Sequence, residues 1–156
     1  MSTLLEQAEL AADLLGAAAH ENGRIVCTAE SLTGGMVSEL ITSVAGSSAW
    51  FDRGYVTYQI SGKEEMIDVP AEVIAAFGVV SEPVAEAMAR GALACSHADL
   101  SVALTGVAGP SGGTAQTPVG TVCIGWAERD PSGAIATSVR TIHVTADRRT
   151  CLLYTS

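Results

Sequence analysis

The sequence predicts an α/β fold, a three-layer α/β/α sandwich with a mixed sheet and a late β-hairpin. Extended and helical patterns alternate over the early part of the chain, as expected for a sheet covered by helices on both faces. Two longer extended segments follow, joined by the turn sequence Asp130-Pro131-Ser132-Gly133, which indicates a hairpin. With 156 residues, 48% of them hydrophobic and 16% charged, and no internal repeat, the chain suits one domain with a substantial core.

The chain is expected to open with a helix and then a strand. Leu4 to His20 carries apolar residues at helical spacing and is followed by Asn22-Gly23, a common signal for the end of a helix. Arg24 to Thr28 is short and largely apolar, which predicts a buried strand. The pattern from Thr33 to Val44 predicts the next helix.

The middle of the chain predicts one strand and three helices. β-Branched and aromatic residues in Arg53 to Gln59 favour a strand, and a brief helix is expected over Ser61 to Ile67. Pro70 to Gly78 predicts another short helix, because proline suits the start of a helix and glycine its end. Ser81 to about Ser96 begins Ser-Glu-Pro, which is typical of a helix start, and predicts the longest internal helix.

Three further strands are expected. Leu100 to Leu104 predicts a buried strand, and the hairpin strands are expected over Val119 to Glu128 and Ile135 to Val144.

The end of the chain has an unusual pattern. Ala146 to Arg149 resembles the first turn of a helix, but few residues follow it. Residues 151–156 match what one reading frame of a common transposase sequencing adapter encodes. We therefore expect a single domain of residues 1–150, a non-native tail over 151–156, and a truncated terminal helix.

Charge and cysteine usage exclude several classes of partner. The formal net charge is −9 without a Lys/Arg cluster, which argues against nucleic acid because tracking phosphates requires grouped cations. No apolar run is long enough to cross a bilayer and no signal-peptide pattern is present, so we expect no membrane partner and a cytosolic location. The four cysteines do not have the spacing of metal ligands, so we expect no metal. We expect their thiols to be reduced and mostly buried. The cysteines are Cys27, Cys95, Cys123 and Cys151.

A glycine-rich turn, Ala29 to Gly35, joins an apolar strand to a helical pattern. In such a turn, the free N–H groups of the first helical turn and the positive end of the helix dipole point at one spot. That spot favours a phosphate, a carboxylate or a developing oxyanion. Ser31 lies beside it and is a candidate nucleophile; the alternative is that Ser31 only caps the helix.

Lys63 is the only lysine among eight basic residues. A lysine amine can lose its charge through burial or a nearby cation and then accept a proton, whereas an arginine guanidinium stays charged. Lys63 is therefore a candidate base for Ser31, and the alternative is a solvated surface lysine. Tyr58, expected at a strand end, can relay or donate a proton; the alternative is that it only packs.

A second glycine-rich segment, Thr105 to Thr114, also follows a predicted strand. Ligands gather at the carboxyl ends of strands in α/β sheets, so the two glycine-rich loops can line one pocket. The alternative is a long connecting loop. The glycine motifs typical of dinucleotide and ATP binding are absent, and Ser31 lies in neither of the serine motifs GxSxG and SxxK.

Six segments occur in the order and with the spacings of one known family. They are Ala29–Gly35, Gly46–Phe51, Arg53–Tyr58, Val79–Glu82, Thr105–Pro110 and Pro118–Val122. From about residue 5 to residue 149, the chain resembles the CinA C-terminal domain family. The resemblance implies nicotinamide-nucleotide amidase activity of the PncC type: hydrolysis of nicotinamide mononucleotide to nicotinic acid mononucleotide and ammonia, in pyridine nucleotide salvage. It implies a stand-alone form, a small-molecule nucleotide substrate and no metal or organic cofactor, and we expect a homodimer.

By position, the resemblance implies that Ser31 is the nucleophile and that Lys63 and Tyr58 supply acid–base catalysis. N–H groups in the turn after Ser31 would hold the oxyanion, and the second glycine-rich loop would hold the ribose phosphate. The implied substrate-binding residues are Thr33, Gly34, Gly35, Thr105, Gly106, Gly109, Gly112, Gly113 and Arg148.

The sequence departs from the family pattern at five positions. The family commonly has a small residue or Cys at Leu32 and Asn at Ile60. It commonly has Ala at Gly62, Lys at Thr117 and Gly at Ala146. The missing Asn at Ile60 weakens the expected ligand pocket most. The alternative function is a non-catalytic nucleotide-binding regulatory domain related to competence and damage-inducible proteins. The retained Lys63 argues against it.

Overall fold

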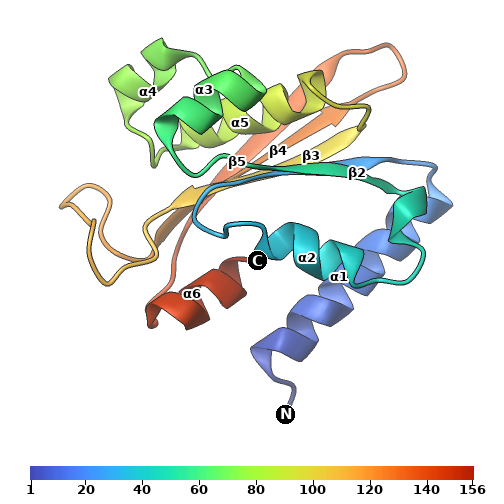
Figure 1. Ribbon diagram of the computed structural model, residues 1–156, viewed down its shortest axis with the longest axis horizontal. Coiled ribbons are helices and arrows are strands. Elements are labelled where there is room, and N and C mark those ends of the chain that lie inside the picture. Colours follow the sequence, from blue (N-terminus) through green and yellow to red (C-terminus); the bar gives the residue numbers. More distant parts are fainter.

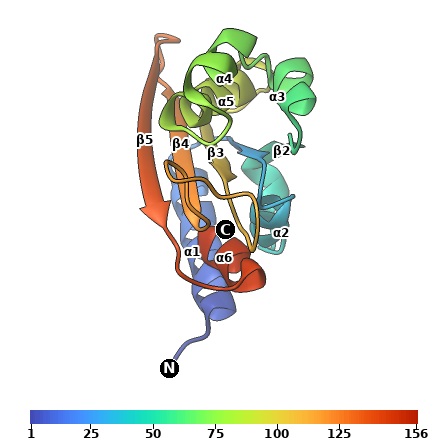
Figure 2. The same cartoon turned by 90° about the vertical axis from the view of Figure 1, so that its left-hand side faces the viewer.

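In the computed structural model, which describes residues 1–156, one five-stranded sheet lies between two layers of helices (Figure 1). The strands are β1 (Val26–Glu30), β2 (Phe51–Val56), β3 (Leu100–Gly106), β4 (Thr121–Arg129) and β5 (Ile135–His143). Their order is β2-β1-β3-β4-β5, with β5 at a free edge (Figure 2). β1 pairs with β2 and β3 in parallel, whereas β3–β4 and β4–β5 are antiparallel. The predicted mixed sheet and late hairpin are confirmed.

The helices divide between the two faces of the sheet, as Figure 1 shows. One face carries α1 (Leu4–Glu21), α2 (Met36–Thr42) and α6 (Arg148–Thr155), and the other carries α3 (Ile60–Ile67), α4 (Ala71–Phe77) and α5 (Glu82–Ala94). A short 3₁₀ helix, Ser47–Ala49, precedes β2. Each face has its own apolar core, so the three-layer prediction is confirmed. None of the helices combines the length and the hydropathy needed to cross a bilayer.

Close packing between α3 and α5 determines where the C-terminal end of α3 lies. Gly91 on α5 faces the carbonyl of Ile67 at the end of α3, and a Cβ at Gly91 would collide with that oxygen. The absence of a side chain at Gly91 therefore lets the two helices approach closely. Ile67 is fully buried in this contact. The contact holds α3, and with it Lys63, close to the sheet.

One of the two largest shifts from the expected boundaries is at α2, which begins at Met36 and not at Thr33. Gly34 and Gly35 have φ values of +59° and +107°, which L side chains rarely adopt, so the helix starts only after them. β2 also runs earlier than expected, over Phe51–Val56, which leaves Tyr58 in the loop that precedes α3.

The C-terminal residues form most of α6, and Cys151 is fully buried in the core. The division into a domain of residues 1–150 and a non-native tail stays a prediction.

All four cysteines are free thiols, three of them buried, as expected; burial raises the pKa of Cys27 to about 11.

Candidate active site

The candidate site lies where the parallel strands β1 and β3 end side by side. The Ser31 N–H donates to the carbonyl of Leu104 at 3.0 Å, and the Thr57 N–H donates to the carbonyl of Glu30 at 2.8 Å. These bonds hold the start of the turn after β1 between the ends of β2 and β3. The two glycine-rich loops therefore meet at one edge of the sheet, as the sequence predicts.

Ser31 and Lys63 form a close pair at this edge. The Lys63 Nζ lies 3.0 Å from the Ser31 Oγ, 2.7 Å from the carbonyl oxygen of Thr57 and 3.3 Å from that of Tyr58. Ser31 is 8% exposed, and the Lys63 side chain is fully buried. The predicted nucleophile and base are thus within hydrogen-bonding distance, whereas a solvated lysine would lie at the surface.

The surroundings of Lys63 favour a neutral amine. Burial lowers the pKa of Lys63 from its ordinary 10.5 to about 8. A neutral amine has two N–H groups, which can donate hydrogen bonds to the carbonyls of Thr57 and Tyr58. Its lone pair then faces the Ser31 hydroxyl. This arrangement suits transfer of the Ser31 proton to Lys63.

Three N–H groups in the turn after Ser31, those of Leu32, Thr33 and Gly35, donate no hydrogen bond within the chain. Of these three residues, Leu32 also lines the cavity that opens beside Ser31, so its N–H is available to an oxyanion that develops there. The expectation that the start of α2 is open to a ligand is wrong for two of its N–H groups. Those of Val37 and Ser38 donate to the buried carboxylate of Glu30.

A cavity of about 280 Å³ opens beside Ser31. The turn after β1, the loop after β3, the segment before α5 and the start of α6 line it. Of the predicted binding residues, Thr105, Gly106, Gly109, Gly112 and Arg148 line this cavity, whereas Thr33, Gly34, Gly35 and Gly113 do not. Ile60, the main departure from the family pattern, does not line it either.

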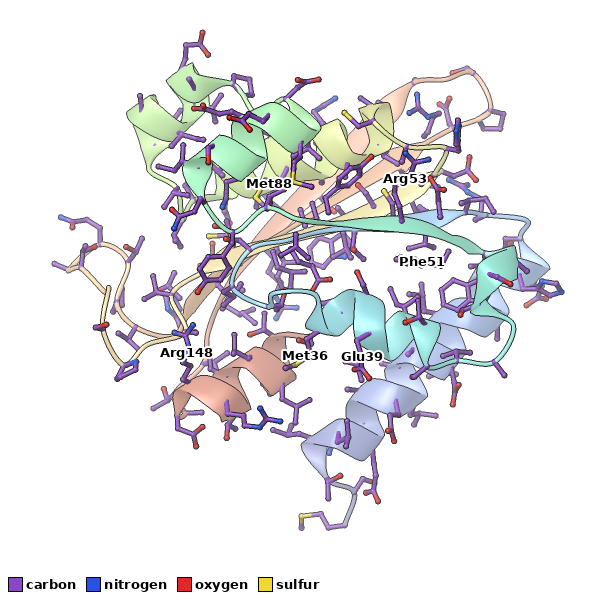
Figure 3. The ribbon with its side chains drawn as sticks, viewed as in Figure 1. Met36, Glu39, Phe51, Arg53, Met88 and Arg148 are labelled. Atoms are coloured by element: carbon purple, nitrogen blue, oxygen red, sulfur yellow. The ribbon has the colours of Figure 1, made fainter.

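Arg148 connects three parts of the cavity wall. Figure 3 shows its side chain reaching from the start of α6 toward the loop after β3. The guanidinium donates to the carbonyl of Gly109 at 2.7 Å and to the Tyr58 hydroxyl at 3.2 Å. Arg148 therefore lines the cavity, and its contact with a phosphate stays a prediction.

Tyr58 contributes to the site in a way that the sequence did not indicate. Its main-chain carbonyl accepts a hydrogen bond from Lys63, while its half-exposed side chain lines the cavity. No hydrogen bond joins the Tyr58 hydroxyl to Ser31 or Lys63. An acid–base role for this hydroxyl stays a prediction.

Sequence reasoning missed two features of the site. Val79 and Val80 line the cavity, and the hydroxyl of Thr105 donates to the carbonyl of Val79 at 2.8 Å. The second missed feature is that Glu30, predicted only as part of the turn, caps α2 with its carboxylate. Its position before Ser31, with a helix following, indicates such a role. No three or more His, Cys, Asp or Glu side chains are grouped to hold a metal ion.

A second, larger cavity of about 690 Å³ lies between the sheet, α1 and α2, and reaches the end of α6. Apolar side chains such as Leu15, Leu40 and Ile124 make up most of its lining. Ser31 lines the smaller cavity and not this one, so the smaller cavity is the candidate active site.

Burial of Lys63 predicts a pH-dependent stability. Between pH 8 and 10.5 the unfolded chain binds more protons at Lys63 than the folded chain does, so the free energy of unfolding rises with pH in this window. Relative to Lys63→Met, the wild type should gain on the order of 3 kcal/mol across the window. Urea titrations of both proteins at several pH values measure the gain, and a constant difference would contradict it.

Comparisons with known proteins give a matching family model and several similar sequences. The sequence model described as the CinA C-terminal domain matches residues 8–154. The chain is 51% identical over 113 residues to the nicotinamide-nucleotide amidohydrolase PncC of Escherichia coli K12, an alignment that covers 72% of this chain and 68% of that protein. A longer relative, a competence-damage inducible protein of Symbiobacterium thermophilum, is 53% identical over 113 residues. That alignment covers 72% of this chain but only 26% of the relative.

A solved structure adds evidence on the fold. The competence/damage inducible protein CihA from Agrobacterium tumefaciens superimposes with a TM-score of 0.89 at 39% identity, covering 99% of this chain and 92% of the other. The sequence match and the shared fold together identify the chain as a member of the CinA C-terminal domain family.

Proposed function

We propose that the chain is a nicotinamide-nucleotide amidase, which hydrolyses nicotinamide mononucleotide to nicotinic acid mononucleotide and ammonia and so serves pyridine nucleotide salvage. The observation that carries this proposal is the 3.0 Å contact between Ser31 Oγ and Lys63 Nζ beside a cavity of about 280 Å³. The resemblance to the PncC protein of E. coli supports the choice of substrate.

The first half of the proposed reaction acylates Ser31. Neutral Lys63 takes the hydroxyl proton while Ser31 Oγ attacks the amide carbon of the substrate. The resulting oxyanion accepts a hydrogen bond from the free N–H group of Leu32. The Lys63 ammonium then returns its proton to the leaving amide nitrogen, which departs as ammonia.

The second half releases the product. Water attacks the ester of Ser31 and gives its proton to neutral Lys63, which then returns a proton to Ser31 Oγ. The product is a carboxylic acid, so no metal or organic cofactor is required by the balance of the reaction. Tyr58 lies beside the reacting groups through its carbonyl, which holds the amine of Lys63 in place.

Arg148 and the loop from Thr105 to Gly113 are proposed to hold the ribose phosphate. Arg148 is the only basic side chain that lines the cavity, and the exposed guanidinium has further N–H groups besides those bonded to Gly109 and Tyr58. A charged phosphate at the mouth would place the nicotinamide ring deeper, toward Ser31.

Replacement of Arg148 should therefore weaken binding of the phosphate. We expect Arg148→Ala to raise KM for nicotinamide mononucleotide by about 10- to 100-fold, as loss of a charge-assisted hydrogen bond does. Hydrolysis of nicotinamide riboside, which lacks the phosphate, should change far less. Arg149→Ala, at the exposed neighbouring position, is the matched control. Equal losses on both substrates would show that Arg148 does not bind the phosphate.

Ammonia release from nicotinamide mononucleotide by purified protein tests the function. The proposal expects equal amounts of ammonia and nicotinic acid mononucleotide. Binding of the nucleotide without ammonia release would instead favour a non-catalytic regulatory domain. A homodimer and a cytosolic location stay predictions; sedimentation of the purified chain measures the first.

A further inference from the structure

Glu30, the residue before Ser31, is a carboxylate that the proposed reaction does not use. Its side chain is fully buried, and none of the three ion pairs of the chain involves it. A buried charge without hydrogen bonds is strongly unfavourable. The surroundings of Glu30 must therefore stabilise the carboxylate in another way.

Three hydrogen bonds hold this carboxylate at the start of α2. Oε1 accepts from the N–H of Val37 at 2.9 Å, and Oε2 accepts from the N–H of Ser38 at 3.0 Å and from its hydroxyl at 2.7 Å. Gly35 occupies the N-cap of α2 and has no side chain to bond these groups. Glu30 thus supplies the cap from the end of β1, and the positive end of the helix favours its charge.

Two further residues lie on the outer side of these bonds. The hydroxyls of Thr28 and Ser38 lie 2.8 Å apart, and since Ser38 gives its proton to Glu30, Thr28 is the donor of this outer bond. Gly54 on β2 leaves space for both hydroxyls, because a Cβ there would collide with the two oxygens. The network therefore requires a glycine at this position of β2.

The turn between the two ends of this network carries Ser31. At its beginning, the main chain of Glu30 and Ser31 is bonded to β2 and β3. Toward its end, Gly34 and Gly35 adopt left-handed conformations and have no side chains to restrict them. The Glu30 carboxylate is the side chain that ties the end of this turn back to its beginning.

We propose that Glu30 is a positioning residue for the hydrolysis. By tying the start of α2 to the end of β1, it directs Ser31 Oγ at Lys63 and aims the free N–H group of Leu32 at the reacting carbonyl. This inference rests on the proposed function for the role of Ser31.

A graded series of variants tests it. Glu30→Gln keeps the size of the side chain, but its NH₂ group faces a donor, so kcat should fall on the order of 100-fold with KM nearly unchanged. Ser38→Ala removes one of the three hydrogen bonds and should lower kcat about tenfold. Thr28→Val, buried and matched in size, removes only the outer hydroxyl, so its kcat should stay within about twofold of wild type.

The rate at which a fluorophosphonate labels Ser31, followed by intact mass, gives a second measure that needs no substrate. We expect the labelling rates to fall in the same order as kcat. A purely structural Glu30 would lower the melting temperature of Glu30→Gln and Ser38→Ala while kcat and labelling per folded molecule stay at the wild-type level, and that result overturns the inference. If Glu30→Gln does not fold, Ser38→Ala against Thr28→Val decides.

The two readouts separate this inference from the proposed function. A wild type that labels at Ser31 but releases no ammonia from nicotinamide mononucleotide contradicts the proposed substrate, and the labelling series still decides the role of Glu30. A wild type that is not labelled has no reactive serine to position, and the inference fails.

Discussion

Ser31→Ala should lower turnover of nicotinamide mononucleotide by more than about a thousandfold while the protein stays folded, because Ser31 carries the only hydroxyl that is hydrogen-bonded to Lys63. Ser31 Oγ makes hydrogen bonds only with Lys63 and, at 3.5 Å, with the carbonyl of Tyr58. Its loss therefore removes little packing. Ammonia release and the melting temperature measure the two effects.

Ser61→Ala is a suitable control for this variant, since Ser61 is exposed on the same helix as Lys63. Its turnover should equal that of the wild type. If folded Ser31→Ala keeps more than about a tenth of wild-type turnover, the nucleophile is an activated water and not Ser31.

Lys63→Arg should be nearly as damaging as Lys63→Ala, with turnover reduced by at least about a hundredfold in both. Arginine keeps the positive charge but cannot accept a proton near neutral pH. The buried site also fits a single nitrogen between three oxygens, which the branched guanidinium does not match. Steady-state turnover of both folded variants provides the comparison.

Near-normal turnover of Lys63→Arg would mean that Lys63 binds the substrate through its charge alone. The pH profile is an independent check. With a pKa of about 8 for Lys63, kcat/KM of the wild type should rise with pH up to about 8 and then level off.

Much of the fold and the central pair follow from local sequence patterns. The apolar strand before Ala29 to Gly35 and the helix after it predict a turn at the carboxyl edge of a parallel sheet. Lys63 stands out because it is the only lysine, and the other seven Lys/Arg residues are all arginines. These inferences succeed because each depends on neighbours in the chain, or on a residue type with few alternatives.

Other parts of the site depend on contacts that local patterns do not encode. The late start of α2 follows from the left-handed Gly34 and Gly35, and its cap comes from the preceding strand. Tyr58 points its carbonyl and not its hydroxyl at Lys63, because β2 ends before it and the chain turns into α3. The partners of these groups are brought together only when the sheet forms.

The most direct test of the account is to trap the ester on Ser31. In the presence of hydroxylamine, the acylated enzyme should transfer its acyl group, so nicotinamide mononucleotide is converted in part to the corresponding hydroxamate, detected by mass spectrometry. Ser31→Ala should form neither acid nor hydroxamate. Ammonia release by the wild type without any hydroxamate, at hydroxylamine concentrations that leave the enzyme active, would contradict a serine ester and the central role of the Ser31–Lys63 pair.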